Sequence, residues 1–280
     1  MTIKIALIYD FDKTLCTKDM QEYGFIPQLG LEAQSFWNSV TEQTKKHNMD
    51  PCLSYMFYML QQANQRKQPI KRNDLVNLGK DIEYFPGVTT WFESIENYAK
   101  QHGIEVEHFI ISSGLKEIIE GTSISKHFKK IYASEYHYDE NGYADWPSMA
   151  VNYTNKTQFL FRINKGTLDI WDDTINEHVP SLDRYIAYEN IIYIGDGMTD
   201  VPCMSLAKKY GGHSIAVYQD DTSICDKLLS QRRVNFIAKA DYSINSELDK
   251  LIKQIILKLV LDNDLQSKHL SQLNITKGNE

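Results

Sequence analysis

The stretch Ile5-Ala6-Leu7-Ile8-Tyr9-Asp10-Phe11-Asp12-Lys13-Thr14-Leu15 decides how the rest of the chain is interpreted. An apolar run ends abruptly in two carboxylates, Asp10 and Asp12. This pattern predicts a buried strand over residues 3–9 of an open α/β sheet, with polar groups at its carboxyl end. In extended chain, residues i and i+2 point to the same side, so both carboxylates can reach one bound group. One could attack a phosphate while the other carries protons beside a metal ion. The structural alternative is that the two carboxylates only cap the following turn.

Three later segments also place polar residues at the ends or starts of predicted elements. Residues 107–114, EHFIISSG, form an apolar strand that ends in small hydroxyl residues and glycine. Residues 191–200, IIYIGDGMTD, form another strand that ends in an acidic turn flanked by glycines. Between them, residues 155–163, NKTQFLFRI, predict a helix that begins with a lysine. Together the segments predict several functional groups at one edge of a sheet.

In this order the four segments resemble the haloacid dehalogenase (HAD) phosphohydrolase superfamily. Its pattern is D-x-D-x-T, then a strand-end Ser or Thr, then Lys, then G-D-G-x-x-D, and all four parts occur here. The joint match is more specific than any one motif. It covers short sites from Asp10 to Asp200 and carries little information on residues 16–85 or on the C-terminal end.

The resemblance implies a role for each of four aspartates. Asp10 would be the nucleophile that forms an acyl-phosphate, and Asp12 would be the general acid and later the base. The dehalogenase branch of the superfamily lacks the second aspartate of this motif, so the presence of Asp12 argues against dehalogenase activity. Asp10 and Asp196, with the backbone carbonyl of Asp12, would hold a metal ion, and Asp200 would either ligate it or orient the metal-bound water. All-oxygen ligation beside a phosphate indicates Mg²⁺ as the cofactor.

The resemblance also implies which groups hold the phosphate. Phe11 in the turn, Ser112 and its neighbour Ser113 are the expected phosphate-binding residues. Lys156 would pair with the nucleophile and the phosphate, with Lys165 as a competing candidate. We favour Lys156 because it opens the helix. Taken alone, a lysine at a helix start is ordinarily a solvated surface residue.

Composition indicates a soluble globular protein. The 280 residues are 42% hydrophobic and 24% charged, enough for one large or two modest domains with a substantial core. A net charge of −7 without a basic arm argues against nucleic acid as the main partner. No apolar stretch approaches the length of a membrane span. The four scattered cysteines indicate free thiols and a cytoplasmic protein: Cys16, Cys52, Cys203 and Cys225.

We predict an α/β fold with a helical insertion after the first strand. Residues 1–15 and 86–265 form a Rossmann-like core, a parallel sheet flanked by helices. Residues 16–85 show helical periodicity and no clear strand, and they lie where the superfamily places a small helical cap of the C1 type. Residues 166–190 are expected to be a surface insertion, and residues 266–280 a frayed, flexible tail.

Local patterns predict several further elements of the core. Residues 136–143 contain an Asn-Gly turn flanked by aromatic residues, which indicates a β-hairpin. Apolar residues at helical spacing predict helices, and short apolar runs predict strands. The predicted helices cover residues 88–102, 115–121, 201–210 and 246–261, and the predicted strands cover residues 130–133, 213–218 and 236–238.

The insertion and hairpin look most like the phosphoserine-phosphatase-like branch of the superfamily. In that branch an acid of the cap contacts the substrate, and Asp19 lies at the matching offset from Asp10, with Glu22 nearby. A cap arginine normally binds the substrate carboxylate, but the only arginines of the insertion, Arg66 and Arg72, lie in a polar run typical of a solvated loop. We therefore expect a small phosphorylated metabolite as the substrate.

Two other functions remain open at this point. A phosphotransferase would pass the aspartyl-phosphate to an alcohol instead of water, and the sequence does not separate this reaction from hydrolysis. A non-catalytic binding module with the same fold is disfavoured because all the expected side chains are present. The sequence also leaves the oligomeric state open, a homodimer being one option.

Overall fold

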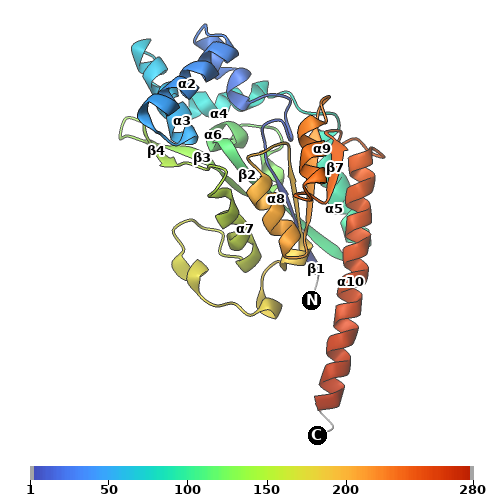
Figure 1. Ribbon diagram of the computed structural model, residues 1–280. Helices are drawn as coiled ribbons and strands as arrows, with labels where there is room; N and C mark the ends of the chain where they lie inside the picture. Colours follow the sequence, from blue (N-terminus) through green and yellow to red (C-terminus); the bar gives the residue numbers. More distant parts are fainter. Residues whose placement is uncertain (1–2, 278–280) are drawn as a thin grey trace.

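The computed structural model describes residues 3–277 and places a seven-stranded sheet at the centre (Figure 1). The strand order is β4-β3-β2-β1-β5-β6-β7, and every strand except β4 runs parallel to its neighbours. The strands are β1 (Ile3–Tyr9), β2 (Ile104–Leu115), β3 (Phe128–Tyr138), β4 (Ala144–Met149), β5 (Ile191–Gly195), β6 (His213–Tyr218) and β7 (Phe236–Lys239). The first strand of the chain therefore lies in the middle of the sheet.

Helices cover both faces of this sheet, as the alternation along β1 requires. Ile5 and Leu7 face a core built with α5 (Val88–Gln101) and α10 (Glu247–Lys277). Ala6 and Ile8 face the opposite core, which is completed by α7 (Lys156–Lys165), α8 (Val201–Lys209) and α9 (Ser223–Ser230). A short helix, α6 (Lys116–Glu120), follows β2. A parallel sheet must bury both of its faces, and helices do so here. The predicted α/β class is therefore confirmed.

The segment between β1 and α5, residues 16–85, is helical as predicted. We call it the helical insertion; it gathers at the carboxyl end of the central strands (Figure 1). Its longest helices pack on each other through buried aromatic and methionine residues. Asp50 begins α3 by accepting hydrogen bonds from the backbone N–H of Cys52 (2.8 Å) and Leu53 (3.1 Å). Its helices are α1 (Phe25–Gln28), α2 (Ala33–His47), α3 (Pro51–Gln65) and α4 (Arg72–Leu78).

The predicted hairpin joins β3 to the antiparallel strand β4. Asp139 N–H donates to the carbonyl of Tyr143 at 2.8 Å, and Gly142 takes a left-handed φ of 78° in the turn. The hairpin also contacts the helical insertion, because Tyr136 donates its hydroxyl hydrogen to the carbonyl of Met56 at 2.7 Å. β3 is longer than the predicted strand over residues 130–133, since its pairing with β4 extends to Tyr138.

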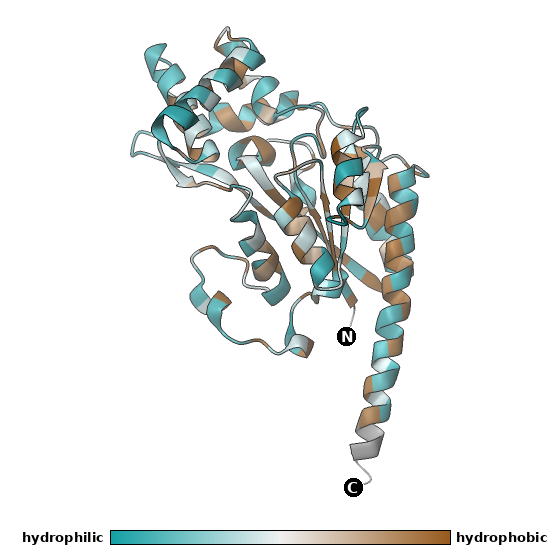
Figure 2. Ribbon diagram, viewed as in Figure 1, coloured by the Kyte–Doolittle hydropathy of each residue, from teal (hydrophilic) through white to brown (hydrophobic). Residues whose placement is uncertain are grey.

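The C-terminal helix α10 corrects the sequence prediction. We predicted a frayed tail from residue 266, but α10 continues without a break to Lys277; residues 278–280 lie outside the described part. Its second half leaves the body, and Leu261 and Leu265 are 65% and 63% exposed (Figures 1 and 2). Lys268 pairs with Asp264 at 2.6 Å, an i,i+4 contact that favours the helix. Within residues 3–277, none of the helices has the length and apolar character needed to cross a membrane.

Residues 166–190 form an ordered excursion that α7 fastens to the core. The guanidinium of Arg162 donates hydrogen bonds to several of its backbone carbonyls, and Lys165 Nζ donates to the carbonyls of Ile175 and Glu177 at 2.5 and 2.6 Å. The cations at the end of α7 therefore hold the excursion in place. The carbonyls bound by Arg162 belong to Thr167, Asp169, Ile170 and Asp172.

Candidate active site

The parallel register brings the ends of β1, β2 and β5 to one level. Tyr9 lies beside Ile110 of β2 and Ile194 of β5. Asp10 N–H extends this pairing by one residue, donating to the carbonyl of Ile194 at 2.9 Å. Side chains that follow these strands therefore meet, although they are far apart in the sequence.

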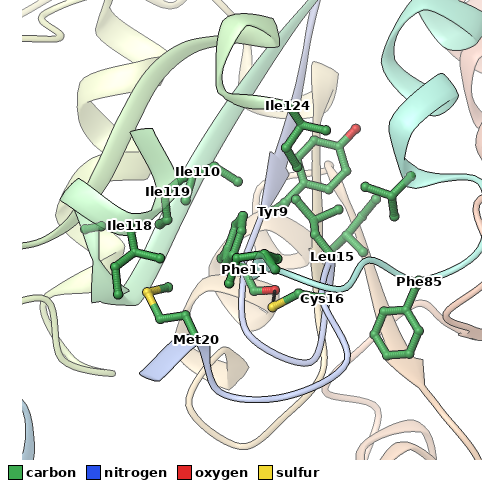
Figure 3. Packing of buried hydrophobic residues seen from close by; sticks show 14 of the residues in the cluster. Tyr9, Phe11, Leu15, Cys16, Met20, Phe85, Ile110, Ile118, Ile119 and Ile124 are labelled. Carbon is green, nitrogen blue, oxygen red and sulfur yellow. Dashed lines mark hydrogen bonds between the residues drawn. The ribbon is translucent and has the colours of Figure 1, made fainter. Parts of the chain in front are cut away.

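Buried apolar side chains support the turn after Asp10 on its core side. Phe11, Leu15 and Met20 are fully buried in the core beneath it (Figure 3). The carbonyl of Phe11 accepts the backbone N–H of Leu15 at 2.9 Å, and Lys13 takes a left-handed φ of 55°. Because the Phe11 side chain is buried in this core, only its backbone is left for the predicted contact with phosphate.

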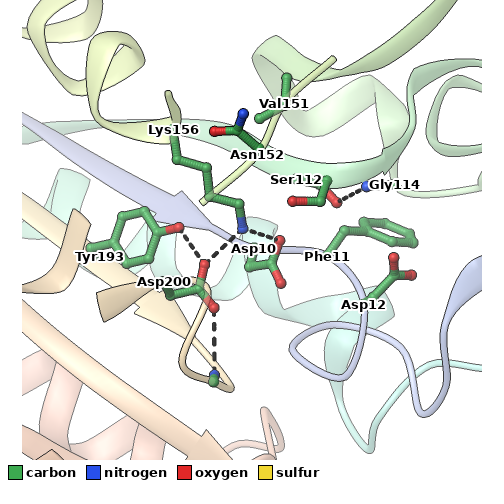
Figure 4. A network of polar contacts seen from close by, with 12 residues as sticks. Asp10, Phe11, Asp12, Ser112, Gly114, Val151, Asn152, Lys156, Tyr193 and Asp200 are labelled. Carbon is green, nitrogen blue, oxygen red and sulfur yellow. Dashed lines mark hydrogen bonds and ion pairs between the residues drawn. The ribbon is translucent and has the colours of Figure 1, made fainter. Parts of the chain in front are cut away.

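A buried ammonium group joins two of the predicted aspartates. Lys156 Nζ lies 2.9 Å from Asp10 Oδ1 and 2.8 Å from Asp200 Oδ1, and all three side chains are buried (Figure 4). Lys156 is the first residue of α7, so the helix start points its side chain at the end of β1. Lys165 lies at the other end of α7, away from this cluster. The structure thus brings Lys156, and not its competitor, to the predicted nucleophile.

Three carboxylates converge around this lysine. Oxygens of Asp10, Asp196 and Asp200 all lie within 4.8 Å of one another. Burial raises the pKa of Asp10 to about 6; Asp200 also raises it, and Lys156 opposes the rise. Burial, with Asp200 and Asp10, raises the pKa of Asp196 well above its usual value. Burial acts to lower the pKa of Lys156, but Asp10 and Asp200 outweigh it and raise the net value.

The chemistry of this cluster suits a divalent cation. Lys156 pairs with Asp10 and Asp200, and the charge of Lys13 acts on Asp196, so three carboxylates face two ammonium groups and negative charge is in excess. Carboxylate oxygens at this spacing are the ligands that Mg²⁺ prefers. The residues present therefore fit the predicted cofactor. The Asp12 side chain is not in this set, which leaves its backbone carbonyl as the expected contribution.

Asp12 lies beyond Phe11, on the side away from Lys156 (Figure 4). Its Oδ1 accepts the backbone N–H of Met20 at 2.8 Å. Burial is the largest cause that raises the pKa of Asp12 well above its usual value, and the negative charges of Asp19 and Asp10 add to it. A carboxyl group that keeps its proton near neutral pH is suited to donate that proton to a leaving group.

The two predicted serines lie where β2 departs from regular pairing. The register with β3 shifts between Ile111 and Leu115, which marks a bulge. Ser112 is buried, and its Oγ accepts the N–H of Gly114 at 3.0 Å. The carbonyl of Ser113 accepts the hydroxyl of Tyr55 from α3 at 2.8 Å, so this residue connects the core to the helical insertion.

Asp19 and Glu22, the two acidic residues predicted to contact the substrate, lie in different surroundings. Asp19 lines a cavity of about 410 Å³ between the helical insertion and the core, and its carboxylate pairs with Lys13 Nζ at 2.7 Å. Glu22 does not line this cavity; it accepts the indole N–H of Trp37 at 2.9 Å. The same cavity reaches Asp12 and Gly114, so it borders the predicted general acid.

Sequence reasoning missed several residues of this site. Tyr193 in β5 is buried and donates its hydroxyl hydrogen to Asp200 Oδ1 at 2.7 Å (Figure 4). The sequence offered a signal for Tyr193: it lies three residues before Asp196, near the end of a strand that leads into the site. Side chains at the end of such a strand lie close to the site. Gln21 lines the cavity, and no motif marks it. Trp37 and Tyr55 also line it, and they belong to the aromatic residues at helical spacing within residues 16–85.

Comparisons with known proteins agree with this geometry. The sequence matches the family described as Putative Phosphatase over residues 5–233. An uncharacterized protein of Borreliella burgdorferi is 29% identical over 279 residues, covering 90% of this chain and 96% of that protein.

Solved structures share the fold. A HAD family hydrolase from Salmonella enterica serovar Typhi superposes with a TM-score of 0.58 at 18% identity, over 89% of this chain and 70% of that one. A substrate-bound phosphoserine phosphatase superposes with a TM-score of 0.57 at 14% identity, over 91% of this chain and 99% of that one. The chain therefore belongs to the Putative Phosphatase family and is a phosphatase with the fold of the HAD superfamily.

Proposed function

We propose that this protein is a Mg²⁺-dependent phosphomonoester hydrolase that works through an aspartyl-phosphate on Asp10. The observation that carries the proposal is the buried contact of Lys156 with Asp10 and Asp200, at 2.9 and 2.8 Å. The lysine orients one carboxylate oxygen of Asp10 and stabilises its charged form. The other oxygen is then available to attack phosphorus.

In the first step, a bond forms between Asp10 and phosphorus while the bond from phosphorus to the leaving oxygen breaks. Asp12 gives its proton to that oxygen, so the product leaves as an alcohol. The raised pKa of Asp12 supports this role, because the carboxyl group must arrive protonated. Ser112, Ser113 and the backbone at Phe11 would hold the oxygens of the phosphoryl group.

In the second step, water attacks phosphorus and the bond from phosphorus to Asp10 breaks. The carboxylate of Asp12 takes a proton from this water, which restores both aspartates and releases inorganic phosphate. Asp10, Asp196, Asp200 and the Asp12 carbonyl would hold Mg²⁺, which neutralises phosphate charge when bound.

We assign the helical insertion, residues 16–85, to a cap that covers the site, and a small phosphorylated metabolite to the cavity beneath it. The cavity between insertion and core supports this assignment. The buried, unpaired cysteines support action in the reducing cytoplasm.

Phosphate release and phosphoenzyme trapping with p-nitrophenyl phosphate test the mechanism. Its leaving group needs no proton, so Asp12→Ala should still release a burst of p-nitrophenol close to one equivalent and then stall as the phosphoenzyme. Asp10→Asn should release none, and EDTA should abolish turnover of the native enzyme. Asp264→Asn, on the projecting part of α10, is the matched control and should behave as the native enzyme. Turnover in EDTA, or a burst from Asp10→Asn, would refute the mechanism.

A further inference from the structure

The turn before α7 fixes the position from which Lys156 reaches the carboxylate cluster (Figure 4). Asn155 N–H donates to Asn152 Oδ1, and Asn152 N–H donates to Asn155 Oδ1, both at 2.9 Å. This reciprocal exchange has the pattern of a capping box, with asparagine at both positions. The backbone N–H of Lys156 then donates to the carbonyl of Asn152 at 3.0 Å. The backbone that carries Lys156 is therefore held by Asn152.

The side-chain amide of Asn152 has one orientation. Its Oδ1 also accepts the backbone N–H of Thr154 at 3.0 Å and the Thr154 hydroxyl at 2.8 Å. Because only the oxygen of an amide accepts hydrogen bonds, these donors place the amide nitrogen on the other side. There Asn152 Nδ2 donates to Asp50 Oδ2 at 2.9 Å. Asn152 therefore joins the start of α7 to the helical insertion, 102 residues away in the sequence.

Asp50 divides its two carboxylate oxygens between two helices. Its Oδ1 caps α3 through the N–H groups of Cys52 and Leu53, whereas its Oδ2 holds Asn152. A second contact joins the same two segments, because Cys52 Sγ donates to the carbonyl of Val151 at 3.3 Å. The starts of α3 and α7 are thus fastened to each other, so a shift of α3 would displace the turn before α7.

Lys156 depends on this placement because its ammonium group works at fixed distances. Its Nζ contacts Asp10 at 2.9 Å and Asp200 at 2.8 Å, and its long side chain is fully buried. A lysine stem is flexible in solvent, but close packing leaves its reach set by the position of the backbone. A misplacement of about 1 Å at a catalytic group can lower a rate about 100-fold. A small displacement of the turn would therefore withdraw the ammonium group from the nucleophile.

We propose that Asp50 and Asn152 are positioning residues that hold Lys156 at Asp10. This inference rests on the proposed phosphatase function, and it makes the helical insertion a part of the catalytic arrangement as well as a cover. The hydrogen bond between Asp50 and Asn152 acts through the start of α7 and not on the reacting atoms. Full activity then requires α3 to be seated on the core.

Exchanging the two side chains tests the pair. Asp50→Asn has a single oxygen, which cannot serve both α3 and Asn152, and Asn152→Asp turns a second carboxylate toward Asp50. Each variant should lower kcat for p-nitrophenyl phosphate about tenfold. The double variant reverses donor and acceptor but restores the hydrogen bond, and both residue types cap helices equally well. It should return kcat to within about threefold of the native value, the non-additivity expected of two residues in contact.

Tyr136→Phe is the matched control for mere fastening of the insertion. It removes the hydrogen bond from Tyr136 to Met56, which also joins α3 to the core but does not involve the start of α7. Its kcat should stay within about twofold of native even if its thermal midpoint falls as far as those of the single variants. A kcat lowered equally in this control, or a double variant as slow as the single ones, would overturn the inference and leave the phosphatase proposal intact.

A crystal structure of Asn152→Asp makes the test independent of turnover. Lys156 Nζ should lie beyond hydrogen-bond distance of Asp10, and an unchanged contact of 2.9 Å would overturn the inference. If native enzyme hydrolyses no p-nitrophenyl phosphate, the proposed function is refuted, and the structure of the variant still decides whether the pair positions Lys156.

Discussion

Replacing Lys156 by methionine is the most informative perturbation of this site. The side chain is buried, and its Nζ contacts Asp10 at 2.9 Å and Asp200 at 2.8 Å. Methionine fills nearly the same space but leaves the carboxylate cluster without its ammonium group. Removing one partner from a buried ion pair costs about 3–5 kcal/mol of stability, because a desolvated charge is left uncompensated. We expect a loss of this size in the free energy of unfolding at about pH 8, measured in EDTA.

This loss should shrink as the pH falls. Burial raises the pKa of Asp10 to about 6 even with Lys156 present, so its carboxylate gains a proton more readily in the folded state than in the unfolded state. Without Lys156 the pKa of Asp10 rises further, and the folded variant binds a proton at a pH where the native protein does not. Proton uptake by the folded state stabilises it, so native and variant stabilities converge toward about pH 5.

Urea denaturation followed by circular dichroism at several pH values measures this difference. Lys165→Met is the matched control: it removes a lysine from the same helix that binds only backbone carbonyls, so its effect should not vary with pH. A loss below about 1 kcal/mol at pH 8, or a loss from Lys156→Met that stays constant down to pH 5, would refute the reasoning.

Three further perturbations test other parts of the structure. Tyr193→Phe removes the hydroxyl that binds Asp200, so kcat for p-nitrophenyl phosphate should fall about tenfold with thermal stability lowered only slightly; an unchanged kcat would contradict this role. Burial lowers the pKa of His108, so its contribution to the free energy of unfolding should decrease as the pH falls below about 6.5, the unfolded value, and urea titrations should show that His108→Gln lacks this contribution. Ile256→Ala in the packed half of α10 should cost about 2–5 kcal/mol, whereas Leu261→Ala on the exposed side should change stability by less than about 0.5 kcal/mol; equal calorimetric shifts would contradict the observed packing.

Local patterns predicted the central strands of the sheet and several helices of the core. Apolar runs that end in polar residues predicted β1 and β5, and helical periodicity predicted α5. These signals are local, because burial on one or both faces imposes a period within a few residues. The full length of α10 also had a local signal, the i,i+4 pair of Asp264 and Lys268, which we did not weigh against the polar composition of the tail.

By itself, the sequence determined the α/β class, the strand-end aspartates and the order of the motifs. It favoured Lys156 over Lys165 only from its place at the helix start, because both lie on one helix and packing decides which end faces the sheet edge. The meeting of Asp10, Asp196 and Asp200 required the parallel register of β1 with β5, a contact between segments about 180 residues apart. The chemistry of the cavity wall was likewise decided only by tertiary structure, because whether a donor is free for a ligand depends on which distant acceptor it has already found.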